Sequence, residues 1–437
     1  MSIDGGNLRH AKLMEALRDP QTAREEILRS FHHRLENIPT QGSSFFIHLS
    51  ELCPVACEHC MYSSDLERKS DKVALSKSEL EDAIRFISES SSQKLNITGG
   101  GEPFLKFSSI LRLLETVEVP RIEIVTAGHW AMTPKRTARM MRQIDEARSR
   151  NPVEPELLLR LSIDRYHLNA PRPVRIEQYG NVLRCWSETQ PNFAVGLRSI
   201  QPDMGTVDRM IADELGADID EVDDWNRLLL LPGGKTVPLT FNVFRRSGKA
   251  LQLAEDHRDA SKTIREYYGP FESRPGNLSL ATAVNDAIRG EYTASAGVAV
   301  TLNSDGTFWI FCGTAPDRKL LLQKQSFAEA VAYFFDDPIT HLLVDEGIWA
   351  LSDLVMEMDP KTHAVALAKN DSASLVDDLL SPDDVRLAVT LISAHQQVTR
   401  NRATIDAEHP LAGLLSDPAV DVAEMCRGLI LGNRQTQ

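Results

Sequence analysis

The chain has 437 residues, of which 42% are hydrophobic and 25% charged, a composition ordinary for a globular enzyme. It carries 62 acidic and 48 basic residues, and the formal net charge of −14 argues against sequence-independent binding of nucleic acid. No stretch predicts a signal peptide or a transmembrane helix, and 6 cysteines do not predict a secreted disulfide framework. We therefore expect a cytoplasmic protein that does not enter a membrane.

Residues 1–43 are polar, with apolar residues at helical spacing, and predict an N-terminal helical extension. Apolar strand patterns then alternate with amphipathic helix patterns. The predicted strands are Ser44–Leu49, Lys94–Thr98, Arg121–Thr126, Leu157–Ile163, Phe193–Ile200 and Thr236–Val243. The predicted helices are Ser76–Glu89, Ser108–Thr116, Pro134–Arg148, Val174–Glu188 and Val207–Leu215. This alternation predicts right-handed βαβ units, a parallel sheet and an α/β fold.

Three cysteines follow the first predicted strand. Cys53, Cys57 and Cys60 have the spacing Cys-x3-Cys-x2-Cys on one loop. Three thiolates this close together can bind three irons of a [4Fe–4S] cluster, which leaves the fourth iron without a protein ligand. Such an iron is free to bind a substrate or cofactor, as the open position of a catalytic zinc is.

Other chemistries fit the same cysteines. They could bind zinc with His59 or His48 as a fourth ligand, form a redox pair beside a third thiol, or be buried thiols. A second motif favours the cluster, because Thr98-Gly99-Gly100-Gly101-Glu102-Pro103 follows the next predicted strand. Glycines let the backbone approach a bound molecule closely, which a small zinc site does not require.

With these two motifs the chain resembles the radical S-adenosylmethionine (radical SAM) superfamily. The resemblance implies a partial (β/α)6 TIM barrel over residues 44–250, with the chemistry at the carboxyl ends of the strands. It implies that Cys53, Cys57 and Cys60 hold a [4Fe–4S] cluster whose open iron binds SAM. An electron donor such as flavodoxin or ferredoxin would reduce the cluster. Cleavage of SAM would then give a 5′-deoxyadenosyl radical that takes a hydrogen atom from the substrate.

The resemblance assigns further residues to the SAM site. Gly99, Gly100 and Gly101 would approach the SAM methionine, and Glu102 would accept a hydrogen bond from its ammonium group. The other expected contacts are Ser162, Asp164, Arg198, Val243, Phe244 and His59. Arg198 would pair with the SAM carboxylate, and His59 would stack on adenine. The structural alternatives are turn chemistry for Ser162 and Asp164, a salt bridge for Arg198 and core packing for Val243 and Phe244. His59 could instead be a loop histidine that donates to the cluster sulfurs.

The rest of the chain predicts a connecting segment at 251–290 and a small α+β C-terminal region at 291–437. Residues 298–312 predict a β-hairpin with an Asp-Gly turn, and helices are predicted at 326–335, 337–346 and about 381–402. The hairpin resembles the SPASM or twitch tail of radical SAM peptide maturases. Too few cysteines remain for an auxiliary cluster, so we expect a tail without one. Cys312 is a candidate hydrogen-atom donor, with core packing as the alternative.

These features together predict a radical SAM enzyme that acts on a peptide or an amino-acid-derived substrate. A small non-peptide metabolite, changed by epimerisation, decarboxylation or rearrangement, is the alternative within the same class. A non-catalytic iron–sulfur or zinc scaffold is the alternative of another class. Anaerobic reconstitution separates the classes, because only the enzyme should release 5′-deoxyadenosine from SAM.

Overall fold

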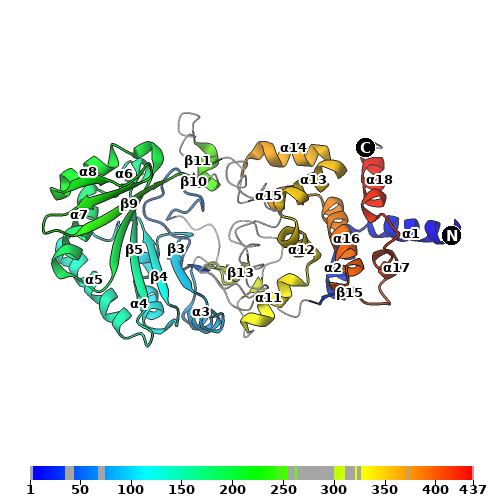
Figure 1. The fold of residues 1–437 in the computed structure, drawn as a ribbon, viewed down its shortest axis with the longest axis horizontal. Helices are drawn as coiled ribbons and strands as arrows, with labels where there is room; N and C mark the ends of the chain where they lie inside the picture. The colour runs from blue at the N-terminus through cyan, green and yellow to red at the C-terminus, as the bar shows by residue number, and fades with distance from the viewer. Residues whose placement is uncertain are drawn as a thin grey trace.

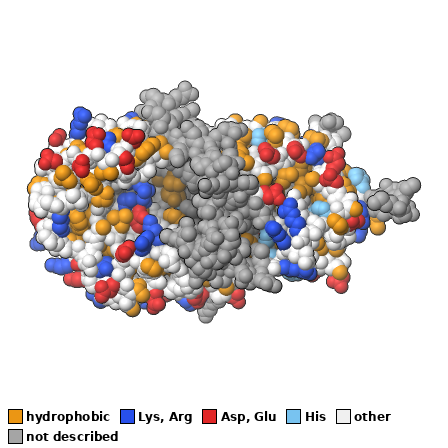
Figure 2. All heavy atoms as spheres, viewed as in Figure 1, with side chains coloured by type: hydrophobic (Ala, Val, Ile, Leu, Met, Phe, Trp, Pro, Cys, Tyr) orange, Lys and Arg blue, Asp and Glu red, His pale blue; other side chains and the backbone are white. Residues whose placement is uncertain are grey.

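The structure is a computed structural model that describes residues 3–34, 44–66, 74–245, 247–253, 261–262, 300–310, 320–321, 326–371 and 374–435. Its elements form two groups. One is a large β-sheet with helices along its outer side, and the other is a set of C-terminal helices joined by the N-terminal ones (Figure 1). Charged side chains of both signs are spread over the visible face, and Lys and Arg gather over the middle of the sheet (Figure 2).

Six parallel strands form the centre of the sheet, in the order β2-β3-β4-β5-β6-β9. They are β2 (Ser44–His48), β3 (Lys94–Thr98), β4 (Arg121–Thr126), β5 (Glu156–Ser162), β6 (Ala194–Ile200) and β9 (Thr236–Asn242). Among the described residues the sheet is open, with β14 and β7 at its two edges. The predicted α/β fold with six parallel strands is therefore confirmed. Because these strands run the same way, the loops after β2 to β5 leave the same edge of the sheet.

The helices predicted between the strands are present and cover the outer side of the sheet (Figure 1): α3 (Lys77–Glu89), α4 (Phe107–Thr116), α5 (Pro134–Ser149), α7 (Ile176–Thr189) and α8 (Val207–Leu215). The start of α3 is fixed by a capping box, in which the side chains of Ser76 and Glu79 each accept a hydrogen bond from the other's backbone N–H. Helix α4 buries Ile110, Leu113 and Leu114, an apolar stripe at helical spacing.

Several short elements of this region were not predicted. They are η1 (Pro103–Lys106), α6 (Arg165–Leu168), η2 (Gln201–Asp203), β7 (Asp218–Glu221), β8 (Asn226–Leu230) and η3 (Gly248–Gln252). Strands β7 and β8 form an antiparallel hairpin that continues the sheet beyond β9. The sequence of β7, Asp-Ile-Asp-Glu, has a single apolar residue, so no alternating apolar pattern predicts this strand.

The predicted hairpin after residue 298 is confirmed as β12 (Val300–Leu302) and β13 (Thr307–Ile310), with Gly306 in the turn at φ 84°. Strand β12 also pairs in parallel with β2, so the sheet continues through the hairpin to β14 (Leu320–Leu321). Cys312 lies outside the described residues. Most of the segment 251–290 does so too, apart from residues 251–253 and β11 (Ser261–Lys262), which pairs with β10 (Phe244–Arg245).

Helices dominate the C-terminal part: α11 (Phe327–Phe335), α12 (Pro338–Asp345), α13 (Ile348–Met358), α14 (Pro360–Lys369), α15 (Leu375–Leu379), α16 (Asp383–Thr399), α17 (Ala412–Leu415) and α18 (Val422–Gln435). The N-terminal α1 (Ile3–Ala16) and α2 (Pro20–Ser30) lie with them (Figure 1). Arg24 on α2 forms a buried ion pair with Asp337 at 2.7 Å. After α2, β1 (Phe31–His33) pairs with β15 (Ala403–Ile405).

The N-terminal extension is thus helical as predicted, and it packs on the C-terminal helices. The division of the chain near residues 43, 250 and 290 stays a proposal. None of the described helices combines the length and apolar character needed to cross a bilayer.

Candidate metal and cofactor site

The loop after β2 brings the three cysteines to one cavity of about 220 Å³, which all of them line. Cys57 is buried, and Cys53 and Cys60 are half-buried. Backbone hydrogen bonds fix the loop, because the N–H of Cys53 donates to the carbonyl of Asp65 (2.8 Å) and that of Cys60 to the carbonyl of Cys57 (3.3 Å). Ala56 has a left-handed backbone (φ 58°) and turns the chain between the first two cysteines.

The thiols also act on one another. A hydrogen bond between Cys57 and Cys60 lowers the pKa of Cys60 to about 5 and raises that of Cys57. Burial raises the pKa of the Cys53 thiol. A bound metal centre replaces such shared protons by its own positive charge. Three thiols gathered on one loop at one cavity are a donor set that suits a [4Fe–4S] cluster.

The glycine turn after β3 packs directly on the cysteine loop. A Cβ on Gly101 would lie 2.1 Å from the Leu52 carbonyl oxygen, and one on Gly99 would lie 1.9 Å from the Gly101 carbonyl oxygen. At Gly100 the nearest atom, the Ser50 carbonyl oxygen, would be 3.4 Å away. The lack of a side chain therefore lets Gly101 contact the cysteine loop and lets the turn itself close tightly at Gly99, and all three glycines also line the cavity.

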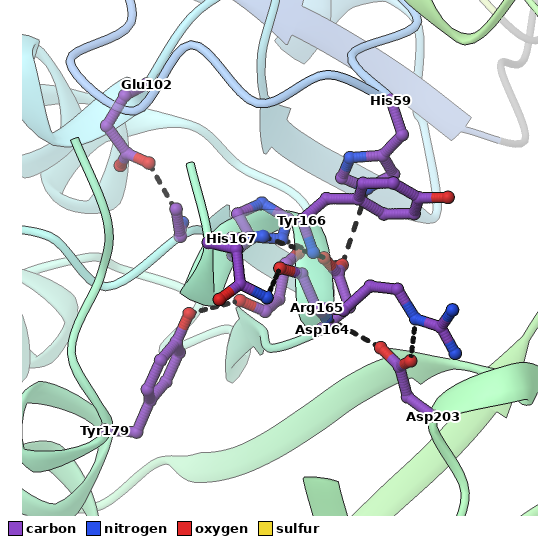
Figure 3. A network of polar contacts seen from close by, with 11 residues as sticks. His59, Glu102, Asp164, Arg165, Tyr166, His167, Tyr179 and Asp203 are labelled. Carbon is purple, nitrogen blue, oxygen red and sulfur yellow. Dashed lines mark hydrogen bonds and ion pairs between the residues drawn. The ribbon is translucent and has the colours of Figure 1, made fainter. Parts of the chain in front are cut away.

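Glu102 lies at the end of this turn with its carboxylate buried (Figure 3). One carboxylate oxygen accepts hydrogen bonds from the Thr126 hydroxyl (2.7 Å) and the Phe104 N–H (3.2 Å), and the other accepts from the Ala127 N–H (2.9 Å). Glu102 thus caps η1 and holds the end of β4. A carboxylate offers about four acceptor positions, so one further donor in the cavity can be accommodated.

Behind the cysteine loop, Asp164 joins two histidines (Figure 3). Its carboxylate lies 2.8 Å from His167 Nδ1 and 3.4 Å from His59 Nε2, and it caps α6 by accepting the backbone N–H groups of Tyr166 and His167. Burial alone would raise the pKa of Asp164, but the two histidines hold it well below its usual range. Burial likewise opposes a charge on His167, yet Asp164 raises its pKa. The ligand atoms of His59, Asp164 and His167 lie within 4.8 Å of one another, close enough to share a metal ion.

The two histidines considered as a fourth zinc ligand are held by other residues. His59 faces Asp164 and stacks on Tyr166, with ring centroids 4.6 Å apart. Burial lowers the pKa of His48 to about 4, Asn303 forms a hydrogen bond with it, and its ring meets Tyr62 edge-on at 4.9 Å. These contacts favour the cluster over a zinc site with three cysteines and one histidine.

The structure brings only some of the other predicted contacts to the cavity. Ser162 and His59 line it. Asp164, Arg198 and Val243 are not among the described residues that do so. The side chain of Phe244 lies outside the described part of the chain, so its predicted contact with adenine stays a prediction.

A second loop, after β10, supports the cysteine loop, and its sequence did not predict this role. The N–H of Lys249 donates to the carbonyl of Cys60 (3.0 Å), and the Ser247 hydroxyl donates to the carbonyl of Met61 (3.3 Å). A Cβ on Gly248 would lie 2.5 Å from that Met61 oxygen. The glycine in Ser-Gly-Lys was the available signal, since glycine permits such close backbone contact.

Comparison with known proteins agrees with this geometry. Residues 41–151 match the family described as "4Fe-4S single cluster domain", a range that holds both the cysteine loop and the glycine turn. The chain thus contains a [4Fe–4S] cluster domain, and the predicted cluster is confirmed. No curated protein matches the chain.

Solved structures that match this chain include anSMEcpe with bound AdoMet and the Kp18Cys peptide, at 12% identity and a TM-score of 0.37, over 65% of this chain and 79% of that one. A structure of the same protein with AdoMet alone has a TM-score of 0.36 over 65% of this chain and 80% of that one, again at 12% identity. HydG, described as a maturase of the [FeFe]-hydrogenase, has 11% identity and a TM-score of 0.32 over 97% of this chain and 88% of its own.

Proposed function

We propose that this chain is a radical SAM enzyme in which Cys53, Cys57 and Cys60 hold a [4Fe–4S] cluster and the adjoining cavity holds SAM. One observation carries the proposal: the three thiols, the three glycines and Glu102 line a single cavity at the carboxyl edge of a parallel sheet. When bound, the cluster and SAM together supply a 5′-deoxyadenosyl radical by reductive cleavage of the sulfonium.

The chain's own residues bind and orient these groups. The thiolates hold the cluster, and Glu102 uses its remaining acceptor position for the ammonium group of SAM, a charge-assisted hydrogen bond. Ser162 and His59 line the same cavity and would provide further contacts to SAM. Asp164 acts through the histidines that it holds in place. Val243 and Phe244 are proposed as apolar contacts for adenine.

We further propose a peptide or amino-acid-derived substrate, because the hairpin β12–β13 resembles the tail of radical SAM peptide maturases. A small non-peptide metabolite is the second candidate. A flavodoxin or ferredoxin would supply the electron in the cytoplasm, and Cys312 is kept as a candidate hydrogen donor. Deuterium transferred from a labelled substrate into 5′-deoxyadenosine would identify the substrate.

The test is anaerobic reconstitution of the full chain and of serine variants. We expect about four irons and four sulfides per chain, a brown chromophore, and 5′-deoxyadenosine released from SAM under reductant. Cys53→Ser, Cys57→Ser and Cys60→Ser should each lose most of the iron. Cys185→Ser is the matched control, because Cys185 is a buried thiol on α7 outside the cavity lining. A colourless zinc protein, or loop variants that keep their iron, would refute the proposal.

A further inference from the structure

A groove of about 590 Å³ lies beside the cysteine loop, and the proposed SAM site does not use it. Its lining comes from three segments: Pro54 and Val55 of the cysteine loop, His129 and Met132 of the loop after β4, and residues between 172 and 181 around the start of α7. We call it the rim groove. Helices α5 and α7, which begin next to the groove, pack against each other on the outer side of the sheet (Figure 1).

Cations without an acidic partner surround the rim groove. Arg172 and Arg175 line it, and both are exposed. Arg136, on the first turn of α5, is also exposed. Burial lowers the pKa of His129, Glu102 opposes this shift, and Arg136 adds to it, so the charge of Arg136 reaches the groove. Within the described part of the chain, none of these three guanidinium groups forms an ion pair.

Little negative charge offsets these cations. Glu177 is the one carboxylate among the described residues that line the rim groove. Lys135 and Arg139 add two exposed cations at the start of α5, and the N-termini of α5 and α7 carry partial positive charge. The groove is therefore locally positive in a chain whose formal net charge is −14. Such a local field favours an acidic partner.

The rim groove also touches the backbone that carries the proposed cluster ligands. Pro54 and Val55 lie between the first two cysteines, and Val55 lines both the groove and the cofactor cavity. The Arg172 Nε donates a hydrogen bond to the Pro54 carbonyl oxygen (2.6 Å). A guanidinium has five N–H donors, so others remain for a partner. A protein seated in the groove would thus lie against the cysteine loop.

The rim groove has the character of a surface for brief encounters. Met132 lines it with 64% of its side chain exposed, close to the apolar Val55, and the arginines stand around this apolar contact. Electron-transfer complexes have small interfaces, and complementary charge steers the two proteins together. Electron transfer between proteins also requires their redox centres to be close, which contact with the cysteine loop provides.

We propose that the rim groove is the docking surface of an acidic electron-donor protein, whose carboxylates pair with Arg136, Arg172 and Arg175. The inference rests on the proposed radical SAM function and deepens it, because reductive cleavage of SAM consumes the electron that the donor delivers. One electron leaves the reduced flavin or iron–sulfur centre of the donor, which is thereby oxidised, and enters the cluster held by the cysteine loop. No proton or chemical group moves with it.

The first test measures binding, without turnover. The reconstituted full chain is titrated calorimetrically with oxidised flavodoxin, in the absence of SAM and reductant, at two salt concentrations. We expect binding that weakens as salt is added. The groove variant, Arg136→Gln with Arg175→Gln, should bind about tenfold more weakly or worse. The matched control, Arg121→Gln with Arg150→Gln, removes the same charge from exposed side chains at the opposite edge of the sheet and should bind like the wild type.

The second test compares two sources of electrons. Dithionite is a small reductant that needs no docking surface, so the groove variant should release 5′-deoxyadenosine with it as fast as the wild type does. With reduced flavodoxin, the groove variant should need about tenfold more flavodoxin to reach half of its maximal rate. Glu177→Gln removes the one carboxylate of the described lining, so it should bind flavodoxin more tightly than the wild type, a gain that poor folding cannot produce.

Three outcomes would overturn the inference. One is equal flavodoxin binding by the groove variant and the control variant, or none by the wild type. Another is an equal loss of 5′-deoxyadenosine release with both reductants, because that pattern marks a structural role of the two arginines. The third is tighter binding of a glutamate-rich peptide than of flavodoxin through the same arginines, which would assign the groove to an acidic peptide.

The docking surface and the enzyme can fail separately. A chain that cleaves SAM with dithionite but binds flavodoxin without the groove arginines keeps its radical SAM function and loses the docking surface. A chain that binds flavodoxin through these arginines but cleaves SAM with neither reductant would refute the radical SAM function and leave the docking surface standing.

Discussion

The contact between the glycine turn and the cysteine loop gives a sharp test, because substitution should be costly at one of two neighbouring glycines and nearly neutral at the other. Gly101→Ala would place a Cβ 2.1 Å from the Leu52 carbonyl oxygen, so the two backbones would have to separate by more than 1 Å to reach ordinary contact at about 3.5 Å. The hydrogen bond from the Glu102 N–H to that same oxygen, now 2.8 Å, would lengthen and break. Gly100→Ala meets its nearest atom at 3.4 Å and needs no such movement.

The magnitude follows from these two effects. Loss of one hydrogen bond costs about 1 kcal/mol. Forcing an extra methyl group against backbone costs roughly 1–3 kcal/mol more. We therefore expect Gly101→Ala to lower the free energy of unfolding by about 2–4 kcal/mol and to lose much of its iron, since Leu52 directly precedes Cys53.

The assay is urea unfolding of both apo variants under nitrogen, followed by iron and sulfide analysis after reconstitution. Gly100→Ala should stay close to the wild type in both measurements. If Gly101→Ala matched Gly100→Ala in stability and iron content, the turn would not be packed on the cysteine loop as the structure has it.

Two other predictions concern buried charges. The pKa of His167 is raised, so its contribution to stability is complete below the pKa of about 6.5 in the unfolded chain and is lost as the pH rises through its pKa in the folded protein. The pKa of Asp164 is depressed, so its contribution is present above the unfolded pKa of about 3.9 and is lost at lower pH. His167→Gln should therefore lower the free energy of unfolding most near pH 6, by about 1.5–3 kcal/mol, and less near pH 9. Urea unfolding at the two pH values checks this, and an equal loss of stability at both would contradict it. Arg24→Leu should destabilise the chain by about 3–5 kcal/mol, because it strands the buried carboxylate of Asp337. Arg142→Leu is the control: it breaks an exposed ion pair with Glu146 and should lower the free energy of unfolding by under about 1 kcal/mol in thermal or urea unfolding. Similar losses of stability in Arg24→Leu and Arg142→Leu would show that the Arg24–Asp337 pair is not buried as described.

Local patterns were enough to predict the central strands and the helices between them. The capping box at Ser76 and Glu79 marks the start of α3, and the six strands agree with their predicted bounds to within one residue. The pairing of distant segments had no such signal. Strand β1 is three residues long and finds its partner β15 almost at the other end of the chain, so no local periodicity indicates it.

The candidate site likewise has features that the sequence predicted and features that it could not predict. The cysteine spacing and the glycine turn identified the residues that meet at the cavity, since both motifs follow strands that end at one edge of the sheet. The partners of Glu102 on β4 could not be read from the sequence, because they depend on how that neighbouring strand end turns. The strand register also places Lys94, Glu123, Arg160 and Arg198 on one face of the sheet. The sequence does not reveal this, because a single charged residue within an apolar strand does not show which residues of other strands it faces.

The pairing of β12 with β2 bears on how the protein should be cut for study. Strand β2 leads into the cysteine loop, and its Phe45 and Ile47 lie in the core beside Val300 and Leu302. A fragment of residues 44–250 would leave the backbone N–H and carbonyl groups along that side of β2 unpaired, next to an apolar surface. Such an edge recruits strands from other chains, so this fragment should aggregate where the 437-residue chain does not. The β12–β13 hairpin therefore protects β2, the strand that leads into the cysteine loop, from pairing with other chains.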